Sequence, residues 1–215
     1  MATLTRRQFV RKSGNSAAIL LGTHSFSSFA KANPSEVVQM AVIGIRSRGS
    51  AHTSTLAKLP NVNVAAICDI DERLLPKAVA DVEKITGKRP KTETDIRRIL
   101  DNKEIDAISI ATPNHWHALA TIWACQAGKH VYVEKPVSYN ISEGRKMVEA
   151  ARKYDRIVQT GTQSRTRPFI QSAMDFLHSG KLGKLYMVKC VVFRPRESLG
   201  RKSNSAVPNG VHYDL

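Results

Sequence analysis

Apolar residues follow two alternating patterns along residues 37–161 of this chain. Short apolar runs predict buried strands, and apolar residues at helical spacing predict helices between them. The strands are expected at 37–43, 62–68, 107–111, 130–134 and 157–160. The helices are expected at 51–59, 74–86, 94–100, 116–127 and 140–154. Alternating strands and helices of this length predict an α/β fold, a doubly wound parallel sheet of the Rossmann type.

The pattern changes after the last of these strands. A helix is expected from Pro168 to Gly180, and residues 185–193 alternate like a strand of a different, antiparallel sheet. From Arg194 the sequence has no periodicity. Because one strand cannot form a sheet, this pattern indicates the start of an α+β domain that is truncated. We therefore expect a Rossmann domain over 33–163 and an incomplete second domain over 164–215.

The turn after the first strand carries the clearest chemical pattern. Gly44 and Gly49 bound the turn, a short helix follows, and Asp69 ends the second strand 20 residues after Gly49. This is the arrangement in which a helix N-terminus holds a pyrophosphate and a carboxylate holds a ribose hydroxyl. Arg46 stands where the full fingerprint has a glycine. The alternative is that Arg46 and Arg48 are solvated loop charges and Asp69 merely ends a strand.

The first 32 residues have the pattern of an export signal rather than of a folded domain. The pair Arg6-Arg7 precedes a modestly apolar segment over 17–22 and a small-residue site at 30–32. This predicts a twin-arginine signal, cleaved before Asn33, and a periplasmic or otherwise extracytoplasmic protein that is exported folded. The apolar segment is shorter than the roughly 20 residues of a membrane span, so no stable membrane anchor is expected. The alternative is a basic N-terminal tail.

Charge and cysteine content narrow the function classes. The formal charge is +15, and removal of residues 1–32, with five basic and no acidic side chains, leaves +10. No basic run is interleaved with aromatic residues, so the sequence argues against nucleic-acid binding. Cys68, Cys125 and Cys190 lie far apart in apolar runs, which predicts small buried side chains and neither a disulfide framework nor a metal site.

The end of the strand over 130–134 brings Glu134, Lys135 and Pro136 to the edge of the sheet where open α/β folds bind ligands. Pro136 holds Lys135 in an extended conformation and can form a cis peptide bond. By its chemistry alone, this tripeptide is also compatible with a purely structural turn.

Six short motifs in this order resemble one enzyme family. They are Val42-Ile43-Gly44 with Arg48-Gly49, Cys68-Asp69-Ile70-Asp71, Ala111-Thr112-Pro113-Asn114-His115-Trp116-His117, Gly128-Lys129-His130-Val131, Glu134-Lys135-Pro136, and Gln159-Thr160-Gly161-Thr162-Gln163. Over residues 36–193 the sequence resembles the Gfo/Idh/MocA oxidoreductases, which include glucose–fructose oxidoreductase and inositol dehydrogenase. The resemblance is strongest to the exported, twin-arginine members. It implies a Rossmann domain followed by an open antiparallel α+β domain that covers the nicotinamide.

The resemblance also implies roles for individual residues. The residues expected to line the pyrophosphate are Gly44, Arg46, Ser47, Arg48 and Gly49, and Asp69 is expected to hold the adenosine ribose. Those expected on the nicotinamide side are Thr112, Pro113, Asn114 and His117, with Glu134, Lys135 and Gln163 near the reacting centre. Because a carboxylate would repel a 2′-phosphate, Asp69 favours NAD over NADP.

The implied reaction is oxidation of a sugar or cyclitol hydroxyl, in which Lys135 stabilises developing alkoxide charge. Export from the cytoplasm implies that the cofactor is tightly retained, and the expected partners are the small substrate and the twin-arginine export machinery. No metal is implied, and a homo-oligomer is compatible with the sequence. Two alternatives stay open: NAD-dependent glycoside cleavage through a keto-sugar, and an inactive dinucleotide-binding fragment.

Overall fold

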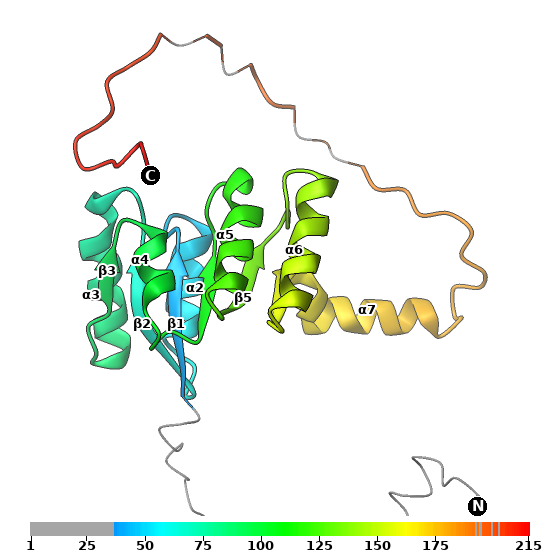
Figure 1. Ribbon diagram of the computed structural model, residues 1–215. Coiled ribbons are helices and arrows are strands. Elements are labelled where there is room, and N and C mark those ends of the chain that lie inside the picture. The colour runs from blue at the N-terminus through cyan, green and yellow to red at the C-terminus, as the bar shows by residue number, and fades with distance from the viewer. Residues whose placement is uncertain (1–36, 192, 194, 199, 202) are drawn as a thin grey trace, which may run out of the picture. The chain divides into compact units, whose positions relative to one another are not determined.

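A computed structural model describes residues 37–191, 193, 195–198, 200–201 and 203–215. The expected export signal over 1–32 lies outside these described residues, so export stays a prediction. Figure 1 shows a sheet with packed helices, then helix α7 and a long C-terminal segment that returns toward the sheet. The described residues belong to one compact unit that reaches to Leu215.

Six parallel strands form the sheet, in the order β3-β2-β1-β4-β5-β6. Their bounds are β1 Val38–Ile43, β2 Val62–Cys68, β3 Lys91–Glu93, β4 Ala107–Ile110, β5 His130–Glu134 and β6 Val158–Gly161. The chain builds outward from β1 in one direction and then from β4 in the other. This reversal between β1 and β4 is the topological switch point of a doubly wound fold, which confirms the predicted fold class.

Helices connect the strands as parallel pairing requires. The α-helices are α2 Arg48–Leu56, α3 Leu75–Thr86, α4 Ile96–Asp101, α5 Asn114–Gln126, α6 Ile141–Lys153 and α7 Pro168–His178. Two 3₁₀ turns, η2 over Glu72–Leu74 and η3 over Gln163–Thr166, lie at the carboxyl ends of the sheet strands β2 and β6. The predicted helices therefore form close to their expected bounds.

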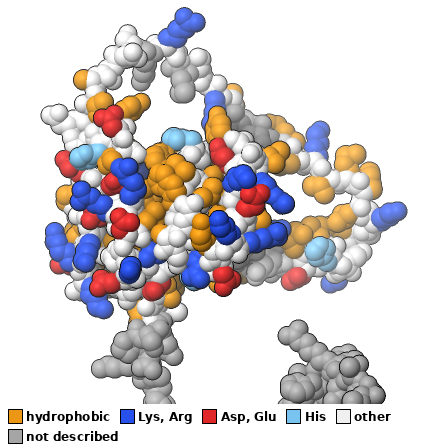
Figure 2. All heavy atoms as spheres, in the orientation of Figure 1, with side chains coloured by type: hydrophobic (Ala, Val, Ile, Leu, Met, Phe, Trp, Pro, Cys, Tyr) orange, Lys and Arg blue, Asp and Glu red, His pale blue; other side chains and the backbone are white. Residues whose placement is uncertain are grey.

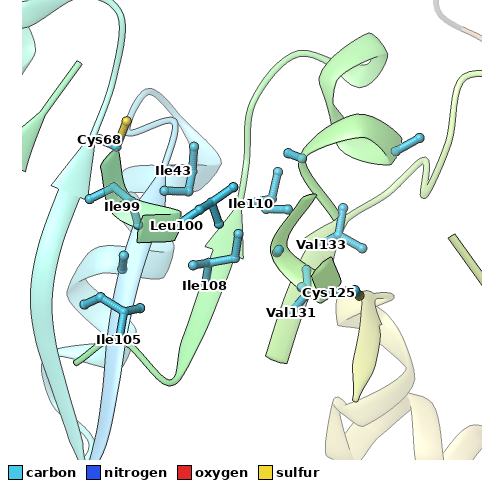
Figure 3. Close-up of a cluster of buried hydrophobic side chains, with 14 of the residues drawn as sticks. Ile43, Cys68, Ile99, Leu100, Ile105, Ile108, Ile110, Cys125, Val131 and Val133 are labelled. Carbon is cyan, nitrogen blue, oxygen red and sulfur yellow. The ribbon is translucent and has the colours of Figure 1, made fainter. Parts of the chain in front are cut away.

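Two apolar clusters hold the sheet between its helices, because side chains alternate along each strand. In β1, Ala41 and Ile43 belong to the cluster with α4, α5 and α6, whereas Val42 belongs to the cluster with α2 and α3. Figure 3 shows the first cluster, with Ile108 and Ile110 of β4. Burial of each of these isoleucine side chains stabilises the folded state by about 1.5–3 kcal/mol relative to an exposed side chain. This packing fixes the strand ends that carry the site.

Strand β3 was not predicted from the sequence. It is only three residues long, Lys91–Glu93, and it pairs in parallel with β2 at the edge of the sheet. Its side chains are polar and mostly exposed. A strand of this kind has no apolar pattern to reveal it, because backbone pairing alone places it in the sheet.

The strand expected at 185–193 does not form in the part of the chain that the structure describes. The described residues over 185–193 belong to no helix or strand. A strand needs a neighbouring strand to which its backbone can hydrogen-bond, and no second strand pairs with these residues in the described part of the chain. Cys190 is exposed, so the prediction that all three cysteines are buried was wrong for this one. Burial raises the pKa of the Cys68 thiol to about 12, as expected of an unreactive core cysteine.

Helix α7 and the segment after it leave many apolar side chains uncovered. The exposed ones include Phe169, Met174, Phe176, Leu182, Leu185 and Tyr186. Figure 2 shows hydrophobic side chains gathered along the edge where α7 runs and in a second group near the centre of this face, with Lys, Arg and acidic side chains intermixed around them. Among the described residues, no helix has both the length and the apolar character needed to cross a membrane.

Candidate functional site

A cavity of about 1100 Å³ lies at the carboxyl ends of the parallel strands. Residues that follow β1, β2, β4 and β5 line it together. It includes the switch point between β1 and β4, where open α/β sheets bind their ligands. The residues predicted from the sequence that line it are Gly44, Arg46, Ser47, Arg48, Asp69, Thr112, Pro113, Asn114, His117, Glu134 and Lys135.

The turn between β1 and α2 requires both of its glycines. Gly44 has a φ of +79°, and a Cβ there would lie 2.9 Å from the backbone of Ala111 and Thr112. A Cβ on Gly49 would lie 1.8 Å from the Gly44 carbonyl oxygen. Only glycine therefore lets β1, the turn and the end of β4 approach this closely.

The N-terminus of α2 opens toward the cavity. Ser47 precedes the helix with a φ of 45°, and its side chain makes no capping hydrogen bond. The first turn contains no acidic residue. Helix N-termini carry backbone N–H groups without helical partners and a partial positive charge. The turn therefore presents the chemistry that an anionic group of a ligand needs.

Asp69 ties the end of β2 to this turn. One carboxylate oxygen accepts a hydrogen bond from the Ile45 backbone N–H at 2.9 Å, and the other accepts from the Asp71 N–H at 2.9 Å. The residue is half-buried and lines the cavity. The carboxylate is thus held in one orientation while its remaining lone pairs can accept hydrogen bonds from a ligand.

Asp71 forms an ion-pair centre at the β2 end of the cavity, for which the sequence predicted no role in the site. Its carboxylate accepts from the Arg73 guanidinium at 2.7 and 2.8 Å and from Arg46 at 2.5 Å. The hydrogen bonds from Arg73, with those from Arg46, hold the pKa of Asp71 well below its ordinary value. Arg46, expected to line the pyrophosphate, therefore has its guanidinium on Asp71. The Cys68-Asp69-Ile70-Asp71 motif was the only sequence signal for this centre.

Glu134 is the centre of a second polar cluster, at the end of β5. Its carboxylate is buried and accepts hydrogen bonds from His52 at 3.0 Å, from Arg48 at 3.2 and 3.3 Å, and from Gln163 at 3.0 and 3.1 Å. Burial raises the pKa of Glu134, but the hydrogen bonds from His52, Gln163 and Arg48 outweigh it and leave the pKa below its ordinary value. Gln163, which does not line the cavity, thus acts on the site through this carboxylate, whereas Arg48 both lines the cavity and contacts Glu134.

His52 was not identified from the sequence, where it is one polar residue inside a short helix. Burial lowers its pKa more than the hydrogen bond and charge of Glu134 raise it. The ring is therefore neutral near pH 7, with Nε2–H donating to the Glu134 carboxylate, which can only accept. The other ring nitrogen, Nδ1, then accepts from the Ser109 hydroxyl at 2.9 Å. His52 thus links α2 to the ends of β4 and β5.

His117 joins two loops of the site. Its ring nitrogens lie 2.6 Å from the carbonyl oxygen of Pro136 and 2.9 Å from that of Thr112. The ring is buried, so it braces these loops more than it contacts a ligand. The Lys135–Pro136 peptide bond is cis, and Lys135 lies exposed on the cavity wall. The Thr112 hydroxyl oxygen is buried and has no hydrogen-bond partner among the described residues.

Comparison with known proteins identifies the family. The Gfo/Idh/MocA family model, described as an oxidoreductase family with an NAD-binding Rossmann fold, matches residues 38–162. A glycosyl hydrolase family 109 protein of Shewanella sp. (strain W3-18-1) is 30% identical over 172 residues, which cover 70% of this chain and 38% of that protein. The uncharacterized oxidoreductase YrbE of Bacillus subtilis is 30% identical over 151 residues, covering 69% of this chain and 42% of that protein.

The structure has solved neighbours in the same family. The myo-inositol 2-dehydrogenase of Lactobacillus plantarum superposes with a TM-score of 0.63 at 29% identity, over 69% of this chain and 43% of that one. The chain thus spans about two fifths of the length of the relatives it matches. The family model covers more than half of this chain and the site is built where its fold binds NAD. This chain therefore belongs to the Gfo/Idh/MocA family of oxidoreductases, with the family's NAD-binding Rossmann fold.

Proposed function

We propose that this chain forms the NAD-binding part of an enzyme that oxidises a hydroxyl group of a sugar or cyclitol. The observation that carries the proposal is the position of Lys135, exposed on the cavity wall directly after the buried carboxylate of Glu134. The similarity to an inositol dehydrogenase supports the same substrate class. NAD, when bound, supplies the acceptor for the hydride that leaves the substrate carbon.

The residues around the cavity fit a dinucleotide. The glycine turn and the N-terminus of α2 would hold the pyrophosphate, and the oriented Asp69 carboxylate would accept from ribose hydroxyls. The buried Thr112 hydroxyl without a partner supports a polar ligand group near β4. Asp69 also favours NAD over NADP, since a 2′-phosphate would meet its negative charge.

In the proposed reaction, Lys135 donates a hydrogen bond to the reacting oxygen. Its ammonium charge stabilises the negative charge that develops as the hydroxyl proton passes to a base. Hydrogen bonds from three side chains hold Glu134 in place. The backbone of Lys135, the next residue, is therefore also held in a defined position at the end of β5. The protein thus orients the substrate oxygen, which is the role we assign to this end of the cavity.

The test is a Lys135→Met variant of the full-length protein, assayed for NADH formation with a panel of sugars and cyclitols. Loss of one donor to a developing oxyanion is expected to lower kcat by about 100- to 1000-fold, with NAD affinity little changed. The exposed Lys77→Met variant is the matched control. An unchanged kcat in the Lys135 variant would contradict this role.

A second function, cleavage of a glycoside through a transient keto-sugar, is favoured by the glycosyl hydrolase family 109 relative. In that reaction the hydride returns to the same sugar, so there is no net redox change. Release of the leaving group from aryl glycosides, without accumulation of NADH, would support this function. NADH accumulation with free sugars would support the dehydrogenase. NAD binding without turnover of either substrate type would indicate an inactive dinucleotide-binding protein.

We also propose that the protein is exported folded, with its NAD in place. The support is the Arg6-Arg7 pair in the sequence, together with a site that requires a folded sheet. Outside the cytoplasm no maintained NAD pool is expected, so the cofactor would be recycled within the site. The double variant Arg6→Lys, Arg7→Lys should leave the precursor in the cytoplasm. Normal export of this variant would contradict the signal.

Cofactor retention has its own test. The purified full-length protein should keep bound nicotinamide through exhaustive dialysis and stay active without added NAD. An enzyme whose activity disappears on dialysis and returns in proportion to free NAD would be an ordinary dissociable dehydrogenase.

A further inference from the structure

The last eight residues, 208–215, are docked on the β2 end of the cavity; we name them the C-terminal strap. Backbone hydrogen bonds join the strap to residues 70–72, at the start of η2: the Glu72 N–H donates to the Gly210 carbonyl at 2.9 Å, and the His212 N–H donates to the Ile70 carbonyl at 2.9 Å. Asp71 and Val211 form an antiparallel bridge between these bonds. In Figure 1 the strap lies at the carboxyl ends of the strands, near α3 and β3.

Side chains make this docking specific. The His212 ring lies 3.1 Å from the Glu72 carboxylate. Gly210 has a φ of +80°, and a Cβ there would lie 3.0 Å from the Arg73 side chain and 3.3 Å from that of Glu72. A larger residue at position 210 would therefore be strained and crowded at once. The strap is thus fitted to η2 rather than only close to it.

The docked strap forms one wall of the cavity. Its lining residues are Pro208, Val211, Tyr213, Asp214 and Leu215, and they share the cavity with Asp69 and the residues around Thr94–Ile96. Tyr213 is 76% exposed, although an aromatic side chain gains much from burial. A large aromatic surface is therefore available on the cavity side where the Rossmann rule places the adenosine ribose.

We propose that the C-terminal strap binds the adenosine part of the dinucleotide, with Tyr213 and Val211 forming an apolar wall against adenine. The proposal rests on the NAD site proposed above and goes beyond it, because it assigns binding residues outside the sheet. Asp214 adds a carboxylate to the cavity that Asp69 lines. Two carboxylates there disfavour a 2′-phosphate more than Asp69 alone would.

The test uses the 215-residue chain and measures the affinities of NAD, AMP and nicotinamide mononucleotide by calorimetry. Tyr213→Ala should weaken NAD and AMP binding by roughly three- to tenfold, as expected for loss of an aromatic contact. Gly210→Val, which obstructs docking, should weaken both at least as much. Nicotinamide mononucleotide affinity should stay within twofold. Tyr186→Ala, at an 89% exposed tyrosine away from the cavity residues, is the matched control.

A second measurement reports on docking directly. Bound AMP should slow amide hydrogen exchange at Glu72 and His212, whose N–H groups form the backbone hydrogen bonds between the strap and residues 70–72. Unchanged AMP affinity in both variants would overturn the proposal, as would an equal loss of nicotinamide mononucleotide affinity, which indicates general damage. AMP binding that depends on Tyr213, in a protein that oxidises no sugar or cyclitol, would support the strap and contradict the proposed function.

Discussion

Two acidic centres lie at opposite ends of the same cavity, and they are held in different ways. Asp71, at the β2 end, pairs with Arg46 and Arg73, whose side chains are 66% and 50% exposed. Glu134, at the β5 end, is satisfied by Arg48, which is 46% exposed, and by His52, whose ring is 7% exposed; the buried ring is the difference between the two centres. Ion pairs with exposed partners contribute at most about 1 kcal/mol, whereas buried partners left unpaired cost several times more. The β5 end is therefore the rigid end, and the β2 end the adjustable one.

The largest effect is expected at Glu134. The variant Glu134→Leu removes the acceptor of three side chains, one of them the buried ring of His52, and should lower the free energy of unfolding by about 3 kcal/mol. Urea denaturation measures this loss. Glu149→Leu, on the exposed face of α6, should change stability far less. Equal losses in the two variants would remove the contrast between the two acidic centres.

Asp69→Ala should come next in size. It removes a charged acceptor from the proposed ribose site and should weaken NAD binding by about 1–3 kcal/mol, while discrimination against NADP relaxes. Calorimetric titration with both cofactors measures this, and Asp81→Ala on the surface of α3 is the control. If the affinities for NAD and NADP both stay unchanged, Asp69 does not hold the ribose.

A smaller effect is expected from pH at the β5 end. Because burial lowers the pKa of His52 below its ordinary 6.5, the unfolded chain takes up this proton at a higher pH than the folded chain does. The contribution of the neutral His52 ring to the free energy of unfolding is fully present above pH 6.5. It declines below that pH, by at most about 1.4 kcal/mol per pH unit. The lowered pKa of Glu134 also makes stability fall with decreasing pH, but only below the ordinary carboxyl pKa of 4.5. Unfolding at several pH values should therefore show stability that falls as the pH decreases below 6.5.

Two variants assign that pH dependence to a residue. His52→Gln should flatten the dependence of stability on pH, while His115→Gln, at an exposed histidine, should leave it as it is. A slope that persists in the His52 variant would show that other groups produce it.

The smallest effect is expected at Arg46. Arg46→Ala removes an exposed guanidinium from the buried carboxylate of Asp71, which keeps both of its hydrogen bonds from the Arg73 side chain. Stability should therefore fall by less than about 1 kcal/mol, and NAD affinity should hardly change. Arg89→Ala, which breaks an exposed pair with Glu83, is the control. A loss of NAD affinity of about 1.5–3 kcal/mol would instead mean that Arg46 donates to the pyrophosphate when NAD is bound.

The sequence predicted the fold well where burial produces a pattern. Strand β2 was expected at 62–68 and forms at Val62–Cys68, because its apolar run is buried on both faces: Val64 and Ile67 belong to one apolar cluster, and Ala66 and Cys68 to the other. The short polar strand β3 and the strap have no such pattern. Backbone hydrogen bonds hold both in place, and these bonds leave no apolar periodicity in the sequence. These elements could not be found from periodicity.

The sequence predicted many of the residues that line the cavity, but not which of their side chains contact one another. The glycine turn, Asp69 and Lys135 were expected at one cavity, and they line it. The hydrogen bond between Arg48 and Glu134 joins residues 86 positions apart, and that between His52 and Glu134 joins residues 82 apart. Pairings at such separations depend on strand order and side-chain rotamers, which a single sequence does not reveal. For this reason His52, Asp71 and the strap were not expected in the site.

Asp69 has a further consequence for the thermodynamics of recognition. Two backbone N–H groups fix its carboxylate before any ligand is present. Immobilising a side chain at a binding interface costs about 0.5–1.5 kcal/mol in conformational entropy. For Asp69 this entropy is lost on folding rather than on association, so its contacts with a ribose contribute to affinity without that penalty. The bonds that shape the turn thereby preorganise the receptor.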